Sequence, residues 1–292
     1  MSGDREDSRR EQVFPHNKLT VMGVLNLTPD SFSDSATLLL PSERPDIDKV
    51  VDKASKLIAS KVDILDIGGE STRPGAEAVS VGREIERVLP AVEALTKSFD
   101  FVISIDTRKA LVASAALDAG AAIVNDVSGF RHDLDLPEIC RRAKGVILGH
   151  LRDEPQSMQD NIKFKDLLSE VARELSCSYE KARTVGIPHS SICLDPGIGF
   201  GKTFAQNLEL IANADLLRSR LPCEVAILFG ISRKAFLGEF VSGGPIARDF
   251  LSHVAGAVAL FLGATIIRVH AVAEAVQMKN LIGALRSARR LM

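Results

Sequence analysis

Short apolar runs alternate with longer amphipathic stretches along most of the chain, and this alternation constrains the fold more than any other feature. The runs are rich in β-branched residues and are too short to form helices like those expected in the amphipathic stretches. Strands that are apolar on both faces are typical of parallel sheets covered by helices. We therefore predict eight strands, at Thr20–Leu25, Asp63–Ile67, Phe101–Ile105, Ala121–Val124, Val146–Leu148, Ser191–Leu194, Glu224–Phe229 and Thr265–Val269.

The stretches between the runs have helical periodicity. The predicted helices are Ile47–Ser60, Ile85–Ser98, Leu111–Ala119, a short one near Leu136–Ala143, Phe164–Val185, Asn207–Ser219, Phe250–Leu262 and Val272–Ala288. Eight strand–helix cycles in 292 residues are the signature of a (β/α)₈ barrel, the TIM barrel of the α/β class. A doubly wound open sheet is the alternative, but the Gly-x-Gly-x-x-Gly turn that it would have after its first strand is missing.

Composition indicates one soluble domain. We find no linker between residues 18 and 292 and expect a single barrel there, preceded by a disordered tail at 1–17, whose first twelve residues are densely charged. The net charge of −2 favours neither nucleic acid nor an anionic membrane as partner. No signal peptide or transmembrane run is present. The four cysteines are scattered and read as reduced thiols, so we expect a cytoplasmic protein.

Polar side chains follow nearly every predicted strand. In a (β/α)₈ barrel the carboxyl ends of the strands form the active-site face. The residues at these ends are Asn26, Asp66, Asp106, Asn125 with Asp126, His150, Asp195, the Ser232-Arg233-Lys234 triplet, and Arg268 with His270. Single members, such as Asp66 or Asp126, could instead cap helices or brace loops. The whole set nevertheless predicts a functional site at the barrel mouth.

This mouth carries both acceptors and cations. Asp106, Asn125 and Asp195 offer carboxylate and amide oxygens from three strands. Buried carboxylates are costly without partners, so they favour a flat ligand with many N–H donors, such as an aminopyrimidine edge. Arg268 and Lys234 follow the last two strands, where these barrels commonly hold phosphate. A surface ion pair for Arg268 and a core-packed imidazole for His270 are the alternatives.

Three loops complete the predicted mouth. The loops after the first and second strands, 26–46 and 68–76, are long, and long loops at a barrel mouth are commonly lids. Their hydroxyls, Phe32 and Arg73 suit a charged or aromatic second substrate, although a plain helix-entry loop is the alternative for each. The loop at 195–203 has three glycines, which let the backbone approach a ligand closely. It does not fit the register of a Walker loop.

These motifs together resemble those of the dihydropteroate synthases. They are N-L-T-P-D-S-F-S-D at 26–34, D-I-G-G-E-S-T-R-P-G at 66–75, S-I-D-T at 104–107, N-D-V at 125–127, D-P-G-I-G-F-G-K at 195–202, S-R-K at 232–234 and R-V-H at 268–270. The first two are highly specific. The resemblance implies a pterin-binding barrel, usually a homodimer, that joins 6-hydroxymethyl-7,8-dihydropterin diphosphate to 4-aminobenzoate with Mg²⁺ in folate biosynthesis.

The resemblance also implies a role for each matching residue. The pterin would be held by Asp106, Asn125, Asp195 and Lys234, and the diphosphate by Asn26, Thr72, Arg268 and His270. Asn26 would contact the Mg²⁺. The aminobenzoate would be bordered by Phe32, Thr72, Arg73, Pro74, Phe200, Ser232 and Lys234. The residues expected to carry catalysis are Lys234, Asp106, Asp195, Arg268 and His270.

The chain departs from the family pattern only in loops. Ser35 and Ala36 stand where two glycines commonly follow, Ala271 replaces the usual Asp, and Asp153-Glu154 lies in a loop that lacks its expected glycine. Three other readings stay open. A non-synthase pterin-binding paralogue would keep the pit, the part of the mouth where Asp106, Asn125 and Asp195 converge, but its loops would not close over aminobenzoate. A methyltetrahydrofolate:corrinoid methyltransferase would lack the first two loop motifs. A Schiff-base aldolase would place Lys234 within an apolar strand.

Overall fold

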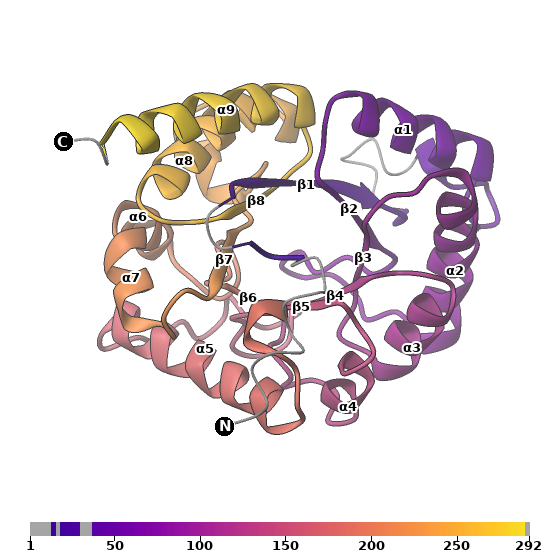
Figure 1. The fold of residues 1–292 in the computed structure, drawn as a ribbon, viewed down its shortest axis with the longest axis horizontal. Coiled ribbons are helices and arrows are strands. Elements are labelled where there is room, and N and C mark those ends of the chain that lie inside the picture. Colours follow the sequence, from indigo (N-terminus) through magenta and orange to yellow (C-terminus); the bar gives the residue numbers. More distant parts are fainter. Residues whose placement is uncertain (1–12, 16–17, 30–36, 290–292) are drawn as a thin grey trace.

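The fold is a closed barrel of eight parallel strands in sequential order, β1 to β8 (Figure 1). The computed structural model describes residues 13–15, 18–29 and 37–289. The strands are β1 (Thr20–Asn26), β2 (Ile64–Gly68), β3 (Ile103–Asp106), β4 (Ile123–Asp126), β5 (Gly145–Gly149), β6 (Ile192–Asp195), β7 (Ala226–Phe229) and β8 (Ile266–Val269). Each predicted strand is found within two residues of its expected ends, and the predicted (β/α)₈ barrel is confirmed.

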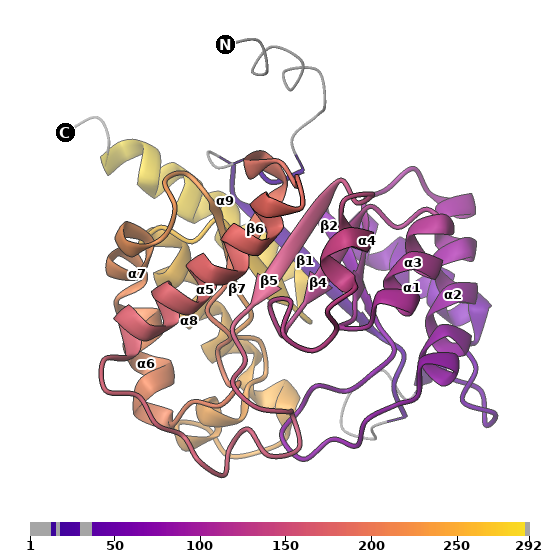
Figure 2. The ribbon, with the colours of Figure 1, turned by 90° about the horizontal axis from the view of Figure 1, so that it is seen from below.

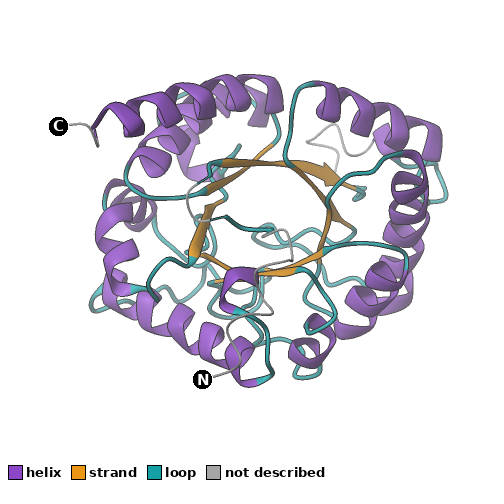
Figure 3. Cartoon of the chain, in the orientation of Figure 1, coloured by secondary structure: helices purple, strands orange, loops and turns teal. Residues whose placement is uncertain are grey.

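Helices form a ring around the strands (Figure 3). They are α1 (Ile47–Ala59), α2 (Val81–Ser98), α3 (Ala110–Asp118), α4 (Leu136–Cys140), α5 (Leu167–Thr184), α6 (Phe204–Ala212), α7 (Ala214–Arg220), α8 (Asp249–Phe261) and α9 (Val272–Arg289). Several begin at side chains that accept from free backbone N–H groups, as Asp166 does at α5. At α6, Thr203 and Gln206 form a reciprocal capping box.

The expected helix at Asn207–Ser219 is wrong, because two helices occupy this region. The break is Asn213, whose backbone is not helical (φ −119°, ψ 35°) and which ends α6 and precedes α7. Its side-chain amide donates to the carbonyl of Glu209 at 2.8 Å. Asn competes with the helical backbone for such hydrogen bonds, so a continuous apolar pattern did not reveal the interruption.

Every second strand residue faces the barrel interior, as the period of a β-strand requires. The interior below the mouth holds one cluster of apolar side chains: Met22, Ile64, Ile123, Ile147, Cys193, Ala226, Leu228 and Ile266. In β2, this parity turns Asp66 and Gly68 inward along with Ile64. In β4, it turns Asn125 inward and Asp126 outward, where Asp126 accepts from Ser128 and Phe130 of the following loop.

Phe14 closes the amino-terminal end of the barrel. Its side chain is buried within the same apolar cluster. Gly145 leaves room for the ring, since a Cβ on residue 145 would lie 2.7 Å from the Phe14 ring. The expected tail at 1–17 therefore needs a correction at Val13–Pro15, which belong to the folded domain. Residues 1–12 and 16–17 lie outside the described residues.

The connections that follow the strands gather at one end of the barrel, beyond the carboxyl ends of the strands (Figure 2). This end is the barrel mouth, where the predicted site residues lie. Among the helices of the described residues, none combines the length and apolarity needed to cross a membrane.

Candidate active site

Residues at the carboxyl ends of the first four strands lie side by side at the barrel mouth. Strand pairing sets Asn26 beside Gly68, Gly68 beside Asp106, and Asp106 beside Asn125. Gly68 is needed in this row, because a Cβ there would lie 3.3 Å from Oδ1 of Asn26 and 3.5 Å from Cβ of Asp106. The missing side chain lets the amide and the carboxylate converge on one point.

Arg268 reaches from β8 across the mouth and forms ion pairs with two carboxylates, those of Asp66 and Asp106. Its Nε donates to Oδ2 of Asp66 at 2.5 Å, and its Nη2 donates to Oδ2 of Asp106 at 2.7 Å. Asp66 also accepts from Nδ2 of Asn125 at 3.1 Å. Burial alone would lower the pKa of Arg268, but the two carboxylates outweigh burial and raise it. Arg268 therefore points into the pit and is neither turned away nor a surface ion pair.

Two carboxyl groups of the pit hold protons more tightly than usual. Burial raises the pKa of Asp106 to about 7, Arg268 opposes this rise, and neighbouring Asp66 adds to it. Burial also raises the pKa of Asp195, against the backbone N–H of Gly197, which donates to its Oδ1 at 2.8 Å. Within the described part of the chain one donor is found for each carboxylate, Nη2 of Arg268 for Asp106 and the N–H of Gly197 for Asp195. A ligand that brings N–H groups would satisfy them.

The glycine-rich loop after β6 is fitted tightly against the loop after β5. Gly197 has φ +67°, and a Cβ there would lie only 2.0 Å from the carbonyl oxygen of His150. Gly199 has φ +81°, and a Cβ there would lie 2.9 Å from Cδ of Lys234. Only glycine fits these two positions, where the loop comes close to the His150 backbone and to the Lys234 side chain.

Lys234 and Phe200 form one side of the mouth. The Nζ of Lys234 lies 3.7 Å from the centre of the Phe200 ring, within the range of a cation–π interaction. Burial lowers the pKa of Lys234 to about 8; Asp195 opposes this shift and Arg268 adds to it. Phe200 also packs with Val127, Leu151 and Met158, which form a separate small apolar cluster. The pit thus has an apolar wall beside its polar floor.

Ser232 and His270 lie together at the ends of β7 and β8. The Ser232 hydroxyl is 3.0 Å from Nδ1 of His270 and accepts from the His270 backbone N–H at 3.2 Å. Burial and the surrounding cations Arg233 and Arg268 lower the pKa of His270, so its imidazole is neutral at pH 7. Arg233 itself is held by both carboxylate oxygens of Asp249, at 2.8 and 2.9 Å. His270 is accordingly a hydrogen-bonding group and not a fixed cation.

Three of the predicted second-substrate residues, Thr72, Arg73 and Pro74, belong to the loop after β2. Thr72 is half-buried, whereas Arg73 and Pro74 are exposed. Arg73 is near enough to lower the pKa values of both Lys234 and His270. Phe32, Ser35 and Ala36 lie outside the described residues. The structure thus brings together Asn26, Asp106, Asn125, Asp195, Phe200, Ser232, Lys234, Arg268 and His270, with Arg73 close by.

Two parts of the site were missed or undervalued in the sequence. For Asp66, two interpretations stayed open, a place in the pit and a helix cap. Its two-residue spacing from Gly68 nevertheless signals an inward side chain. Lys202 was not assigned at all. Its buried Nζ donates to the carbonyls of Gly197 and Phe200, both at 3.0 Å, and lies 3.0 Å from Nδ1 of His150. Sequence alone gives no sign of this inward turn.

Comparison with known proteins agrees with this geometry. The family described as "Pterin binding enzyme" matches residues 22–270. Dihydropteroate synthase of Synechocystis is 39% identical over 94% of this chain and 93% of its own length. A Haloferax volcanii protein described as a probable bifunctional folylpolyglutamate synthase/dihydropteroate synthase is 40% identical over 99% of this chain, which spans only 33% of that protein.

Solved structures show the same relationship. Yersinia pestis dihydropteroate synthase, in complex with a sulfonamide drug, has a TM-score of 0.86 and 36% identity over 93% of this chain and 96% of its own. The Burkholderia cenocepacia enzyme, complexed with 7,8-dihydropteroate, has a TM-score of 0.81 and 36% identity over 94% of both chains. Fold, pit and sequence therefore agree that the chain belongs to the pterin-binding enzyme family, among the dihydropteroate synthases.

Proposed function

We propose that this chain joins 6-hydroxymethyl-7,8-dihydropterin diphosphate to 4-aminobenzoate and releases 7,8-dihydropteroate and diphosphate. The observation that carries the proposal is the pit itself, in which Asp106, Asn125 and Asp195 converge beside Arg268 and Lys234. Acceptors that lack donors suit the N–H edge of a pterin, and cations beside them suit its diphosphate. The product bound by the Burkholderia relative supports the same substrates.

The pterin would lie flat between the polar floor and the apolar wall. Asp106, Asn125 and Asp195 would receive its ring N–H and amino groups, and Lys234 would donate to a ring acceptor. The cluster of Val127, Leu151, Met158 and Phe200 offers the ring an apolar surface. Such a pocket combines area for the ring faces with a few polar groups that fix its orientation.

The diphosphate would be held at the rim. Nε and Nη2 of Arg268 are engaged by carboxylates, but its Nη1 makes no hydrogen bond within the described part of the chain. This nitrogen is left for a phosphate oxygen. Neutral His270, the Thr72 hydroxyl and Asn26 would add further hydrogen bonds. Together these groups would stabilise the negative charge that grows on the leaving diphosphate.

Mg²⁺ fits the residues that are present. Within 13–15, 18–29 and 37–289, no cluster of three His, Cys, Asp or Glu side chains is arranged to hold a metal ion. Mg²⁺ commonly binds through one or two protein oxygens together with substrate phosphates and water. The Asn26 amide oxygen, close to Gly68 at the end of β1, would be such a single ligand. Mg²⁺ bound with the diphosphate would neutralise part of its charge.

The aminobenzoate would approach from the loop side. Arg73 offers a guanidinium for its carboxylate, Pro74 and Phe200 offer apolar surface for its ring, and Ser232 offers a hydrogen bond. We also assign Phe32 to this subsite by motif, although it lies outside the described residues. Closure of the two loops would exclude water and orient the amine toward the pterin.

The chemical step would be a substitution at the exocyclic methylene of the pterin. The bond between this carbon and the diphosphate oxygen breaks, the electron pair leaves with the diphosphate, and the amine lone pair forms the new C–N bond. The resulting arylammonium nitrogen then loses its extra proton to solvent. The aromatic amine is neutral at pH 7, so its attack needs no strong general base. A dissociative path is favoured because the dihydropterin ring can delocalise positive charge, which Asp106 and Asp195 would stabilise nearby.

We further propose a cytoplasmic homodimer. All four cysteines (Cys140, Cys177, Cys193 and Cys223) are free thiols, and two of them are exposed, which suits a reducing compartment. Helices α8 and α9 expose large apolar side chains on neighbouring surfaces, which suits an interface with a second copy. Neither nucleic acid nor a membrane is part of the proposal.

The experiment that tests the function is incubation of the purified chain with the pterin diphosphate, 4-aminobenzoate and Mg²⁺. We expect dihydropteroate and diphosphate in equal amounts by chromatography, and no product when either organic substrate is omitted. Tight binding of a pterin without turnover would contradict the synthase and identify a pterin-binding paralogue. Methyl transfer from methyltetrahydrofolate would instead identify the corrinoid methyltransferase.

A further inference from the structure

A network of charged side chains lies beside the pit and outside it. Glu70 is in the loop after β2, which we call loop 2 (residues 69–80), Arg108 and Lys109 follow β3, and Glu154 is in the loop after β5, which we call loop 5 (residues 150–166). None of these residues was assigned to a substrate. The side chains of Glu70 and Arg108 are almost fully buried, at 5% and 6% exposure, whereas that of Glu154 is 57% exposed.

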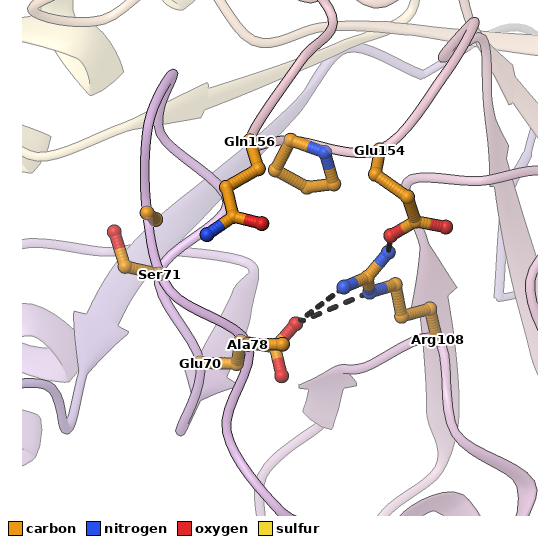
Figure 4. Close-up of a pocket in the computed structure, with 8 residues that line it drawn as sticks. Glu70, Ser71, Ala78, Arg108, Glu154 and Gln156 are labelled. Carbon is orange, nitrogen blue, oxygen red and sulfur yellow. Dashed lines mark hydrogen bonds and ion pairs between the residues drawn. The ribbon is translucent and has the colours of Figure 1, made fainter.

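Arg108 bridges the two loops. Its Nε and Nη2 contact Oε1 of Glu70 at 3.1 and 3.0 Å, while its Nη1 pairs with Glu154 (Figure 4). His132 joins the exposed end of the bridge, 3.2 Å from Oε1 of Glu154. A second connection is a backbone hydrogen bond of 3.1 Å from Gly75 of loop 2 to Pro155 of loop 5. Loop 5 therefore contacts loop 2 at both a side-chain and a backbone link.

The base of loop 2 is fixed more firmly than its tip. Lys109 pairs with Glu70, and its Nζ donates to Glu84 and to the Val79 carbonyl, both at 2.6 Å. Glu70 also accepts from the Val79 backbone N–H at 3.1 Å. Burial would raise the pKa of Glu70, but Lys109 and Arg108 outweigh it and lower the pKa. The buried, ionised Glu70 therefore holds the two ends of loop 2 firmly in place.

Within the described residues, the one hydrogen bond that joins the tip of loop 2 (residues 71–78) to another segment is that from Gly75 to Pro155 of loop 5. A pocket separates the two loops and is lined by Ser71, Ala76 and Ala78 on one side and by Pro155 and Gln156 on the other (Figure 4). Thr72, Arg73 and Pro74, the expected aminobenzoate residues, lie in this tip between the anchored base and Gly75. Their position thus depends on the two links that span the pocket.

We propose that the Glu70–Arg108–Glu154 bridge is a positioning device that holds loop 2 over the aminobenzoate subsite. This inference rests on the proposed function for its substrate, but not for the contact between the loops. Arg108 and Glu154 touch no substrate in this arrangement. Ordering a binding loop in advance lowers the free-energy cost of closing it on the ligand, so the bridge increases affinity for the aminobenzoate and leaves pterin affinity unchanged.

The test uses Glu154→Gln, because the buried Arg108 and Glu70 cannot be replaced without risk to folding. Gln keeps the size of the side chain and removes its charge. The matched control is Asp153→Asn, which makes the same charge change on the adjacent exposed residue, for which no contact with Arg108 is found within the described residues. Both variants should unfold at the same temperature as the natural chain.

Hydrogen exchange of loop 2 amides measures the contact without any turnover. We expect residues 71–78 to exchange faster in Glu154→Gln than in the natural chain, and at the natural rate in Asp153→Asn. Equal exchange in all three proteins would overturn the proposed bridge. This measurement stands even if the chain proves not to be a synthase, so the two proposals can fail separately.

Steady-state kinetics then measures the consequence. Because an exposed ion pair has a modest effect, we expect KM for 4-aminobenzoate to rise about 2- to 5-fold in Glu154→Gln, with kcat and the KM for the pterin diphosphate unchanged. Added salt should raise the KM of the natural chain for 4-aminobenzoate, because salt weakens the Arg108–Glu154 ion pair. The KM of Glu154→Gln should rise less. An unchanged KM for aminobenzoate, or an equal rise in both KM values, would show that the bridge does not position this subsite.

Discussion

At the scale of single residues, ligand binding in the pit depends on carboxylates that can still accept hydrogen bonds from a ligand. Within the described residues, the Asp195 carboxylate accepts one hydrogen bond, from the backbone N–H of Gly197, and Lys234 is near enough to oppose the rise in its pKa. In Asp195→Asn the shape is kept, but an NH₂ group replaces an acceptor where the pterin would donate. We expect kcat/KM to fall about 100-fold, the loss of one or two charge-assisted hydrogen bonds.

Initial rates of diphosphate release measure this loss. The control is Asp100→Asn, an exposed position in the connection that precedes β3, at the end of the barrel opposite the mouth, which should keep full activity. Activity of Asp195→Asn within a factor of three of the natural chain would remove Asp195 from the pterin site.

The pKa of Asp106 predicts a pH dependence of pterin binding. The ionised carboxylate accepts the pterin N–H, and burial raises the pKa of Asp106 to about 7 in the free protein. Binding should therefore release a proton, and affinity should rise with pH, by about 10-fold from pH 6 to pH 8. The same shift acts oppositely on folding: because the folded state holds this proton more tightly, its contribution to stability falls as pH rises from about 4 to 7.

Calorimetric titration with 6-hydroxymethylpterin at pH 6, 7 and 8 gives these affinities. Asp106→Asn cannot titrate at this position, so any dependence that remains in it belongs to the ligand. The same pH slope in both proteins would contradict the assignment.

At the scale of elements, the glycine-rich loop predicts a paired result. Gly197 and Gly75 both have positive φ, +67° and +80°, but only Gly197 is crowded, since a Cβ there would lie 2.0 Å from the His150 carbonyl oxygen. We expect Gly197→Ala to lower the free energy of unfolding by about 2 kcal/mol or more, through strain and clash together. Gly75→Ala, where nothing lies within 4 Å, should cost about 1 kcal/mol.

Urea unfolding of the two variants compares these values directly. Equal destabilisation would show that backbone strain alone matters and that the close approach of the two loops does not.

Elements were predicted from the sequence better than their interruptions. The strands were recognised because they are short β-branched apolar runs that alternate with amphipathic stretches, and the helix α1 was recognised from its helical period. The break at Asn213 was missed, since its cause is a side chain that bonds the helical carbonyl of Glu209. Such competition between side chain and backbone leaves hydrophobic periodicity intact.

At the scale of the whole molecule, the sequence predicted which strand ends form the mouth but not how their charges pair. Asp66 and Arg268 are 202 residues apart, and only closure of the barrel brings them together. The Arg108 bridge is hidden for the same reason, because Glu154 is 46 residues further along the chain and reaches Arg108 only in the folded barrel. Alternation within a strand could have signalled Asp66, whereas nothing local signals Lys202 or Arg108.

The outer surface predicts the assembly. On α8, Phe250, Val254 and Val258 are spaced by four residues and lie on one exposed face; Phe250 is 74% exposed. The neighbouring helix α9 exposes Leu281 and Leu285, again four residues apart (Figure 1). Exposed apolar side chains that gather on two adjacent helices are typical of a protein–protein interface. The mouth lies at the strand ends, so a copy docked on these helices leaves it open.

We therefore expect the natural chain to sediment at micromolar concentration as a dimer of the 31.5 kDa chain, and Phe250→Glu to sediment as a monomer. A buried, unpaired carboxylate at the centre of an apolar interface is costly enough to dissociate it. Leu134→Glu is the matched control, because Leu134 is 84% exposed but lies beside α4, away from this face, and it should remain dimeric. A natural chain that sediments only at 31.5 kDa, or a dimeric Phe250→Glu, would exclude α8 as the interface.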